Sequence, residues 1–271
     1  MVKHSNLTVA AIQMVSSTRA DDNMNLAARL ISDAASRGAQ LVLLPEYFCI
    51  MGKHDTDKVN LKEGFGSGPL QDFLANQAKA NNVWLIGGTI PISSNVEDLI
   101  YNSTLVYDPQ GKFKARYDKI HLFGFNNGKE EFTESDTIKP GNPEAIVFDG
   151  PCGKVGLSVC YDLRFPELYR AMGNISLIVV PSAFTYTTGR AHWEILLRAR
   201  AIENQCYVLA AAQGGKHESG RRTWGHSMLI DPWGKIVDEL PEGNGVVIGT
   251  VNQSSLSRVR NALPALQHRV L

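Results

Sequence analysis

The segments LVLLPEY (residues 41–47) and LIVVPSA (177–183) share one pattern, in which four apolar residues are followed by a proline and then a polar residue. The residue before a proline is held extended, so each segment predicts a strand that runs straight to a fixed end. The next side chain, Glu46 or Ser182, can then be presented at the edge of a sheet. For Ser182 we favour the simpler interpretation, an ordinary strand ending.

A second pair of segments repeats as well. YDPQGKFKARY (107–117) and IDPWGKIVDEL (230–240) share the pattern D-P-x-G-K between β-rich flanks. Asp, Pro and Gly at these positions favour a type I turn, so both segments predict hairpins. The two repeats together indicate an α/β protein with two similar halves, each a sheet with helices outside. If the two sheets pack face to face, the fold is a four-layer α-β-β-α sandwich.

Helical patterns alternate with these strands. The apolar spacing predicts helices over 23–38, 68–82 and 191–205, with Pro69 at the first position of the second. Nearly continuous apolar strands such as VWLIGGTI (83–90) are typical of sheets covered on both faces. Since no linker-like or low-complexity stretch interrupts the pattern, the sequence predicts a single domain over residues 1–271.

Composition excludes several classes of function. The chain is 44% hydrophobic, and its 27 Lys plus Arg balance 27 Asp plus Glu, which argues against a nucleic-acid partner. No apolar run approaches the roughly 18 residues of a membrane span, and the N-terminal segment 1–14 is not typical of a signal peptide. The four cysteines are sparse and lack C-x-x-C spacing. We expect a soluble, reduced, cytoplasmic protein without a membrane partner.

The segment GLSVCYDLRFPELYR (156–170) carries the candidate nucleophile. A strand-like run reaches Cys160, and Pro166 then suits the first turn of a helix, whose N-terminal dipole would favour a nearby anion. From these residues alone, Cys160 is either a reactive thiol or a small buried residue. Cys206 is expected in the core, whereas Cys49 is a candidate to line a pocket. Motifs of serine hydrolases, zinc sites and nucleotide-binding loops do not occur.

Three sequence motifs carry a resemblance. LLPEYF with Glu46, RYDKIHLF with Lys119 and GLSVCYDLRFPEL with Cys160 resemble, in order, the Glu-Lys-Cys triad of the nitrilase superfamily, the carbon–nitrogen hydrolases. ESDT (134–137) is similar to the family segment with a second glutamate, here Glu134. The resemblance extends from residue 7 to the C-terminus, although Gly124 stands where many relatives have aspartate.

The resemblance implies a thiol amidohydrolase that cleaves a small carboxamide to its acid and ammonia through a cysteine thioester. Glu46 would act as general base and Cys160 as nucleophile. Lys119 and the backbone N–H of Tyr161 would stabilise the oxyanion, and Glu134 would orient Lys119. The implied mechanism uses no metal and no organic cofactor.

Arg164 has two interpretations. It could form an ion pair with Glu167 in the turn after the nucleophile, which we slightly favour, or it could bind a substrate carboxylate. His192 and Trp193 are expected to be packing residues of the 191–205 helix. The resemblance further implies that this helix and the C-terminal segment form the interface of a homodimer or a higher even oligomer.

Within the superfamily, the segment 189–234 and the ending LPALQHR (263–269) are similar to the branch that hydrolyses deaminated glutathione. Three alternatives stay open. An ω-amidase acting on α-ketoglutaramate or a carbamoylase would use the same chemistry on another substrate. A catalytically silent scaffold would have no reason to keep Glu46, Lys119 and Cys160 together, so the intact triad argues against it.

Overall fold

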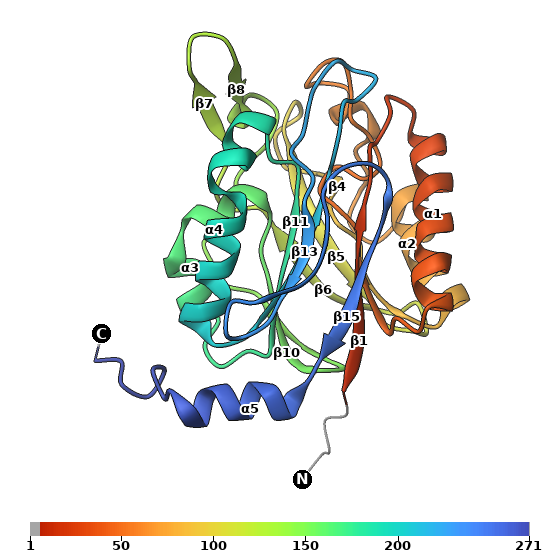
Figure 1. Ribbon diagram of the computed structural model, residues 1–271. Coiled ribbons are helices and arrows are strands. Elements are labelled where there is room, and N and C mark those ends of the chain that lie inside the picture. The colour runs from red at the N-terminus through yellow and green to blue at the C-terminus, as the bar shows by residue number, and fades with distance from the viewer. Residues whose placement is uncertain (1–5, 271) are drawn as a thin grey trace.

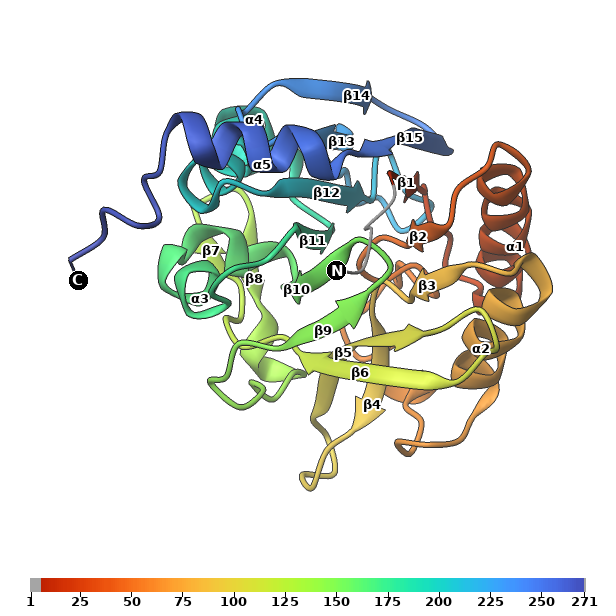
Figure 2. The same ribbon diagram turned by 90° about the horizontal axis from the view of Figure 1, so that it is seen from below.

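Two β-sheets packed face to face form the centre of the protein. The computed structural model describes residues 6–270, so residues 1–5 and 271 of the predicted domain lie outside the described residues. Helices α1 (Ala20–Ser36) and α2 (Pro69–Asn81) cover the outer face of one sheet, and α3 (Pro166–Ala171) and α4 (Tyr186–Asn204) cover the other (Figure 1). Figure 2 shows the same layers from below. The predicted four-layer α-β-β-α sandwich is confirmed.

The first sheet contains a parallel centre with antiparallel strands beside it. Across the sheet the strands are β15 (Gly245–Val251), β1 (Leu7–Gln13), β2 (Leu41–Leu43), β3 (Trp84–Ile86), β5 (Ile100–Tyr107) and β4 (Ile90–Ser93), with β6 (Phe113–Asp118) paired to β5. β1, β2 and β3 are parallel to one another, whereas β15 and β5 flank them in the opposite direction.

The second sheet repeats this plan. Its strands are β14 (Ile236–Leu240), β13 (Ser227–Ile230), β12 (Tyr207–Ala212), β11 (Leu177–Ser182), β10 (Gly153–Leu157) and β9 (Val147–Gly150). β10, β11 and β12 are parallel, and β9 and β13 pair antiparallel at either side. In each sheet the carboxyl ends of the parallel strands therefore lie at the same end. Open α/β sheets bind their ligands at this end.

Alternating side chains of the strands build two separate apolar layers. Along β1, Val9 and Ala11 point into the core between the sheets, while Ala10 and Ile12 pack with the core beneath α1 and α2. This alternation follows from the two-residue period of a strand. Because both faces of β1 are buried, its sequence is a nearly continuous apolar run.

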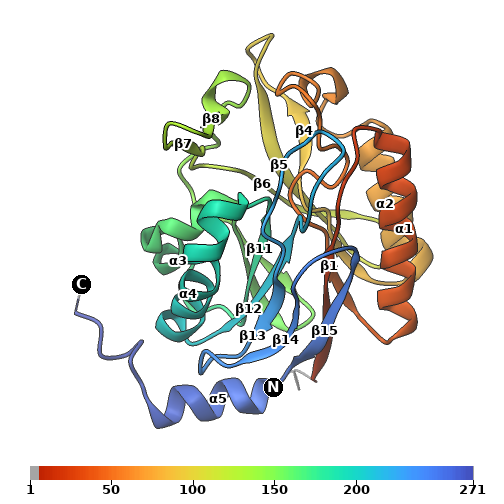
Figure 3. The same ribbon diagram turned by 45° about the horizontal axis from the view of Figure 1, so that its top comes forward.

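Short elements surround the carboxyl end of the sheets. They are the hairpin of β7 (Gly124–Asn126) and β8 (Glu131–Thr133), and the 3₁₀ turns η1 (Val59–Leu61), η2 (Glu134–Asp136) and η3 (Cys160–Arg164). Figure 3 shows the β7–β8 hairpin and the loop between β12 and β13 standing at this end. At the opposite end, α5 (Gln253–Ala262) follows β15, and the C-terminal segment extends away from the sandwich (Figure 1).

Both predicted hairpins are present, as β5–β6 and β13–β14. In each turn the aspartate closes the loop, because Asp108 Oδ1 accepts hydrogen bonds from two backbone N–H groups and Asp231 Oδ1 does the same. The second predicted helix matches α2. The third begins earlier than predicted, at Tyr186, since the Thr185 side chain caps it by accepting from the N–H of Thr188. Across residues 6–270, no helix has the length and apolarity to span a bilayer.

Candidate active site

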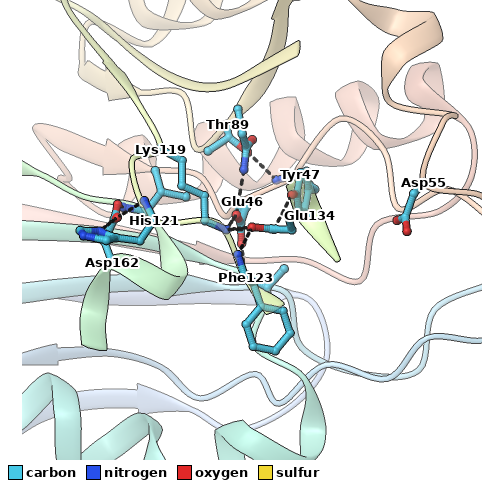
Figure 4. Close-up of polar contacts among 12 residues, drawn as sticks. Glu46, Tyr47, Asp55, Thr89, Lys119, His121, Phe123, Glu134 and Asp162 are labelled. Atoms are coloured by element: carbon cyan, nitrogen blue, oxygen red, sulfur yellow. Dashed lines mark hydrogen bonds and ion pairs between the residues drawn. The ribbon is translucent and has the colours of Figure 1, made fainter. Parts of the chain in front are cut away.

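The strand ends that carry the candidate residues meet at one place between the sheets. Glu46 follows β2 of the first sheet, and Cys160 follows β10 of the second. Lys119 comes directly after β6, and Glu134 opens η2. Figure 4 shows Glu46, Lys119 and Glu134 pointing toward one another. The structure thus brings the four predicted side chains together from four separate parts of the chain.

Glu46 is buried and its carboxylate is held at both oxygens. Oε1 accepts hydrogen bonds from Lys119 Nζ at 3.0 Å and from Asn102 Nδ2 at 2.9 Å. Oε2 accepts from the backbone N–H of Ala183 at 2.9 Å. The Cys160 side chain also interacts with this carboxylate and acts to lower the Glu46 pKa. The carboxylate is therefore positioned against the thiol before any ligand binds.

Lys119 is fully buried between two carboxylates. Besides Glu46, its Nζ donates to Glu134 Oε1 at 2.9 Å and Oε2 at 2.7 Å. Glu134 is itself fixed by the Tyr47 hydroxyl at 2.8 Å and by the Phe123 backbone N–H at 2.7 Å. The predicted contact between Lys119 and Glu134 is present, and Figure 4 shows Tyr47 beside it.

Burial and charge shift the pKa values of these groups in opposite directions. Burial raises the pKa of Glu46, and the charge of Lys119 offsets this only in part. Burial alone would lower the pKa of Lys119, but the charges of Glu134 and Glu46 raise it well above its usual value. For Glu134, burial acts to raise the pKa, yet Lys119 outweighs it and the pKa is lowered. At neutral pH, Lys119 and Glu134 therefore form a fixed ion pair, and Glu46 is the more basic carboxylate.

Cys160 lies in a turn of unusual backbone conformation. Its φ is 49°, in the left-handed region that non-glycine residues seldom occupy, and such strain persists where the surroundings hold it. Burial raises the pKa of the thiol well above its usual value, the Glu46 charge adds to this, and Lys119 opposes it. The resting thiol consequently keeps its proton, within reach of a carboxylate that can accept it.

Asp162 secures that turn and was not singled out from the sequence. Its buried carboxylate accepts at Oδ2 from the Val159 N–H at 2.8 Å and from the Tyr117 hydroxyl at 2.7 Å. Oδ1 lies 3.1 Å from the His121 N–H and 2.7 Å from His121 Nδ1. These bonds tie the turn after Cys160 to the segment on both sides of Lys119. The only signal in the sequence is the place of Asp162 inside the cysteine motif.

A cleft opens to the solvent over Cys160. Glu46, Glu134, Cys160, Tyr161 and Arg164 all line it. The cleft also contains residues that the sequence analysis missed, among them Lys58 and Arg221, because nothing in their local sequence marks them.

The favoured ion pair between Arg164 and Glu167 is wrong. The Arg164 guanidinium instead lies 5.7 Å from the Tyr161 ring and 5.5 Å from the Phe184 ring, with NH1 3.2 Å from His192 Nδ1. These aromatic neighbours turn Arg164 toward the cleft, whereas Glu167 begins α3. His192 is exposed rather than a packing residue, while Trp193 is fully buried as expected.

The cysteines other than Cys160 do not line the cleft. Cys206 is a core residue as expected, and Cys49 is buried without lining the cleft, so the pocket interpretation of Cys49 is wrong. Within residues 6–270, no three His, Cys, Asp or Glu side chains gather in a way that could hold a metal ion.

Comparison with known proteins identifies the family. The carbon–nitrogen hydrolase model matches residues 8–261. A protein named deaminated glutathione amidase from Yersinia enterocolitica is 43% identical over 270 residues, covering 97% of this chain and 93% of the relative. One of the same name from Homo sapiens is 39% identical over 267 residues, covering 96% and 81%. The solved structure of Saccharomyces cerevisiae Nit3, a member of branch 10 of the nitrilase superfamily, has a TM-score of 0.87 at 31% identity, covering 98% and 97%. The chain therefore belongs to the carbon–nitrogen hydrolases of the nitrilase superfamily, enzymes that hydrolyse carbon–nitrogen bonds.

Proposed function

We propose that the protein is a thiol amidohydrolase that uses Glu46, Lys119 and Cys160 to hydrolyse deaminated glutathione. The observation that carries the mechanism is that Glu46 is bonded to the Lys119 ammonium and lines one cleft together with Cys160. A nucleophile, a base and a fixed cation in one constellation are the parts that acyl transfer needs. The substrate rests on the similarity to proteins named deaminated glutathione amidase.

In the first half of the reaction, Glu46 takes the proton of the Cys160 thiol and the sulfur attacks the amide carbonyl. Protonation neutralises Glu46 and weakens its bond to Lys119, which frees an N–H of Lys119 for the developing oxyanion. The backbone N–H of Tyr161 is the second donor in the proposal. Loss of one such donor costs about 10²–10³-fold in rate in other hydrolases.

In the second half, Glu46 returns the proton to the leaving nitrogen as the carbon–nitrogen bond breaks, and a thioester remains on Cys160. A water molecule then gives a proton to Glu46 and attacks the thioester carbonyl. The acid leaves, and the sulfur recovers its proton. Glu134 is a positioning residue, because its bidentate contact fixes the Lys119 ammonium.

The leaving group depends on the substrate. Both amides of deaminated glutathione are secondary, so its hydrolysis releases an amine, and the expected release of ammonia holds only for a primary carboxamide such as α-ketoglutaramate. Cleavage of the γ-linked amide yields α-ketoglutarate from either compound. We place the carboxylate of this shared acyl half on Arg164, which lines the cleft four residues after the nucleophile.

The decisive experiment measures α-ketoglutarate formed from deaminated glutathione and from α-ketoglutaramate by the full-length protein. We expect kcat/KM to be at least about tenfold higher for deaminated glutathione. Cys160→Ala should abolish turnover of both, while Cys206→Ala, a change at a core cysteine, should retain it. Preference for α-ketoglutaramate would identify an ω-amidase, and turnover by Cys160→Ala would refute the mechanism. A well-folded wild-type protein inactive on both would refute the substrate.

The proposal includes a homodimer formed through α4. Ile195 and Ile202, two helical turns apart, and Trp233 in the β13–β14 turn are 70%, 49% and 63% exposed. Large apolar side chains gathered on one surface are typical of an interface. Ile195→Lys should therefore convert a dimer to a monomer in light scattering, whereas a wild-type monomer would refute this part. We also propose a cytoplasmic location, because all four cysteines are free.

A further inference from the structure

Besides Arg164, two further cations line the cleft. Lys58 and Arg221 both line the cleft, and each reaches the same carboxylate oxygen, Oδ1 of Asp55. The distances are 3.4 Å from Lys58 Nζ and 3.9 Å from Arg221 NH1. Figure 4 shows Asp55 on the far side of Tyr47 and Glu134 from Asp162. Two elements distant in sequence thus place two positive charges around one exposed carboxylate.

The charge of this cluster is not balanced. Asp55 is 63% exposed and accepts only long contacts, so it neutralises at most one of the two cations. Burial lowers the pKa of Lys58, and the charge of Arg221 lowers it further, while Asp55 and Glu134 act in the opposite direction. The two cations therefore repel each other, and a second anion close to both would relieve that repulsion.

Aromatic rings hold both cations in place. Lys58 Nζ lies 5.6 Å from the centre of the Tyr47 ring, and the Arg221 guanidinium lies 5.3 Å from that of Phe132. The Tyr47 hydroxyl donates a hydrogen bond to Glu134, which also accepts one from Lys119. Through Tyr47 and Glu134, Lys58 is thus connected to the candidate catalytic residues.

Deaminated glutathione carries one carboxylate on each side of its γ-linked amide, whereas α-ketoglutaramate carries only one. We propose that Arg221 and Lys58 bind the terminal carboxylate of the leaving peptide half, and that this contact selects a peptide amide over a primary carboxamide. The inference rests on the proposed function. It divides the cleft into an acyl side with Arg164 and a leaving-group side with Arg221 and Lys58.

The neighbouring arginine provides a matched control. Arg222 does not line the cleft; its guanidinium lies 3.8 Å from the Tyr186 ring, and NH2 is 3.7 Å from Glu242. Arg221→Ala and Arg222→Ala remove the same charge from adjacent positions of one loop. A general effect of charge or of loop stability would affect both variants alike.

The test compares deaminated glutathione with its C-terminal amide, which lacks only the terminal carboxylate, and measures α-ketoglutarate. We expect Arg221→Ala to lower kcat/KM about 10- to 100-fold for deaminated glutathione, the usual effect of losing a hydrogen bond between charged groups. For the C-terminal amide the loss should be less than about threefold, as should the effect of Arg222→Ala on either substrate. Lys58→Gln should reproduce the selective loss, and it serves if Arg221→Ala does not fold.

Two results would overturn the inference, and they are distinguishable. If wild-type protein hydrolyses deaminated glutathione but Arg221→Ala and Lys58→Gln affect both substrates equally, or neither, the leaving-group assignment is wrong and the proposed function stands. If wild-type protein does not hydrolyse deaminated glutathione, the proposed function and the inference fail together.

Discussion

The two strand ends with the same sequence pattern, LVLLPEY and LIVVPSA, meet at the site in different roles. At the first, the Glu46 side chain enters the cleft, and both of its oxygens are hydrogen-bonded. At the second, the backbone acts: the N–H of Ala183 donates to Glu46 Oε2 at 2.9 Å. The Ser182 hydroxyl is buried and has no partner among the described residues. One local pattern therefore supplies the carboxylate and the other supplies a donor that holds it.

This difference shows what a proline near a strand end does and does not determine. Strand β2 ends at Leu43, before Pro45, whereas β11 continues through Pro181 to Ser182, and the two facing sheets bring these ends together. Chemistry then depends on the partners that other elements provide, such as Asn102 from β5 and Lys119 after β6. Ser182 meets no such partners, which agrees with its interpretation as an ordinary strand ending.

The largest expected loss of activity is at the first strand end, at Glu46. Glu46→Gln keeps the shape of the side chain but removes the base, so kcat/KM should fall by at least about 10³-fold, within the range for loss of general base catalysis. Steady-state kinetics on deaminated glutathione measures this. Glu63→Gln is the control, because Glu63 is also buried but accepts hydrogen bonds from the start of α2. Near-normal activity of Glu46→Gln would remove the distinction between the two strand ends.

The pH dependence of activity should follow Glu46. Because burial raises its pKa above the usual 4.5, the carboxylate accepts a proton, and loses its function as base, at a pH above 4.5. We expect kcat/KM to fall about tenfold per pH unit below that pKa, or about 100-fold two units below it. Since the pKa of Lys119 is raised well above 10.5, no loss from Lys119 is expected up to that pH. An acidic limb that starts below pH 4.5 would contradict this assignment.

Asp162→Asn tests how far the turn that begins at Cys160 depends on the hydrogen bonds of the Asp162 carboxylate. An amide cannot accept at both ends as the carboxylate does, so we expect about 2 kcal/mol of lost stability, measured by denaturant unfolding. If the turn then positions Cys160 less well, kcat should fall about tenfold while KM stays within about threefold. Loss of stability with unchanged kcat would show that Asp162 supports the fold and does not position the thiol.

The smallest effect is expected at the second strand end. Ser182→Ala removes a buried hydroxyl that has no partner, so kcat/KM should change by less than about threefold. Stability should stay equal or rise by up to about 1 kcal/mol, because removal of an unsatisfied buried polar group relieves its desolvation cost. Kinetics and thermal unfolding measure both. A large loss of activity would mean that both strand ends contribute side-chain chemistry.

The sequence predicted the architecture well, because hydrophobic period and turn chemistry are local signals. The apolar runs, the two D-P-x-G-K turns and Pro69 led to the sandwich, the hairpins and α2. The start of α4 was missed, since a threonine cap is a weak local signal. The single domain over 1–271 and the roles of the site residues remain predictions.

What the sequence by itself determined is which residue types are available and which segments form strands and turns, because proline, glycine and apolar spacing act over a few residues. Only the tertiary structure decided which groups meet. Asn102 reaches Glu46 from another strand of the same sheet, whereas the N–H of Ala183 and the carboxylate of Asp162 bond to Glu46 and Tyr117, respectively, across the two sheets. The grouping of Lys58 with Arg221, and the pairing of Arg164 with aromatic rings instead of Glu167, depend on elements far apart in the chain. Burial in that shared space also sets the pKa of Glu46, a property that no single segment contains.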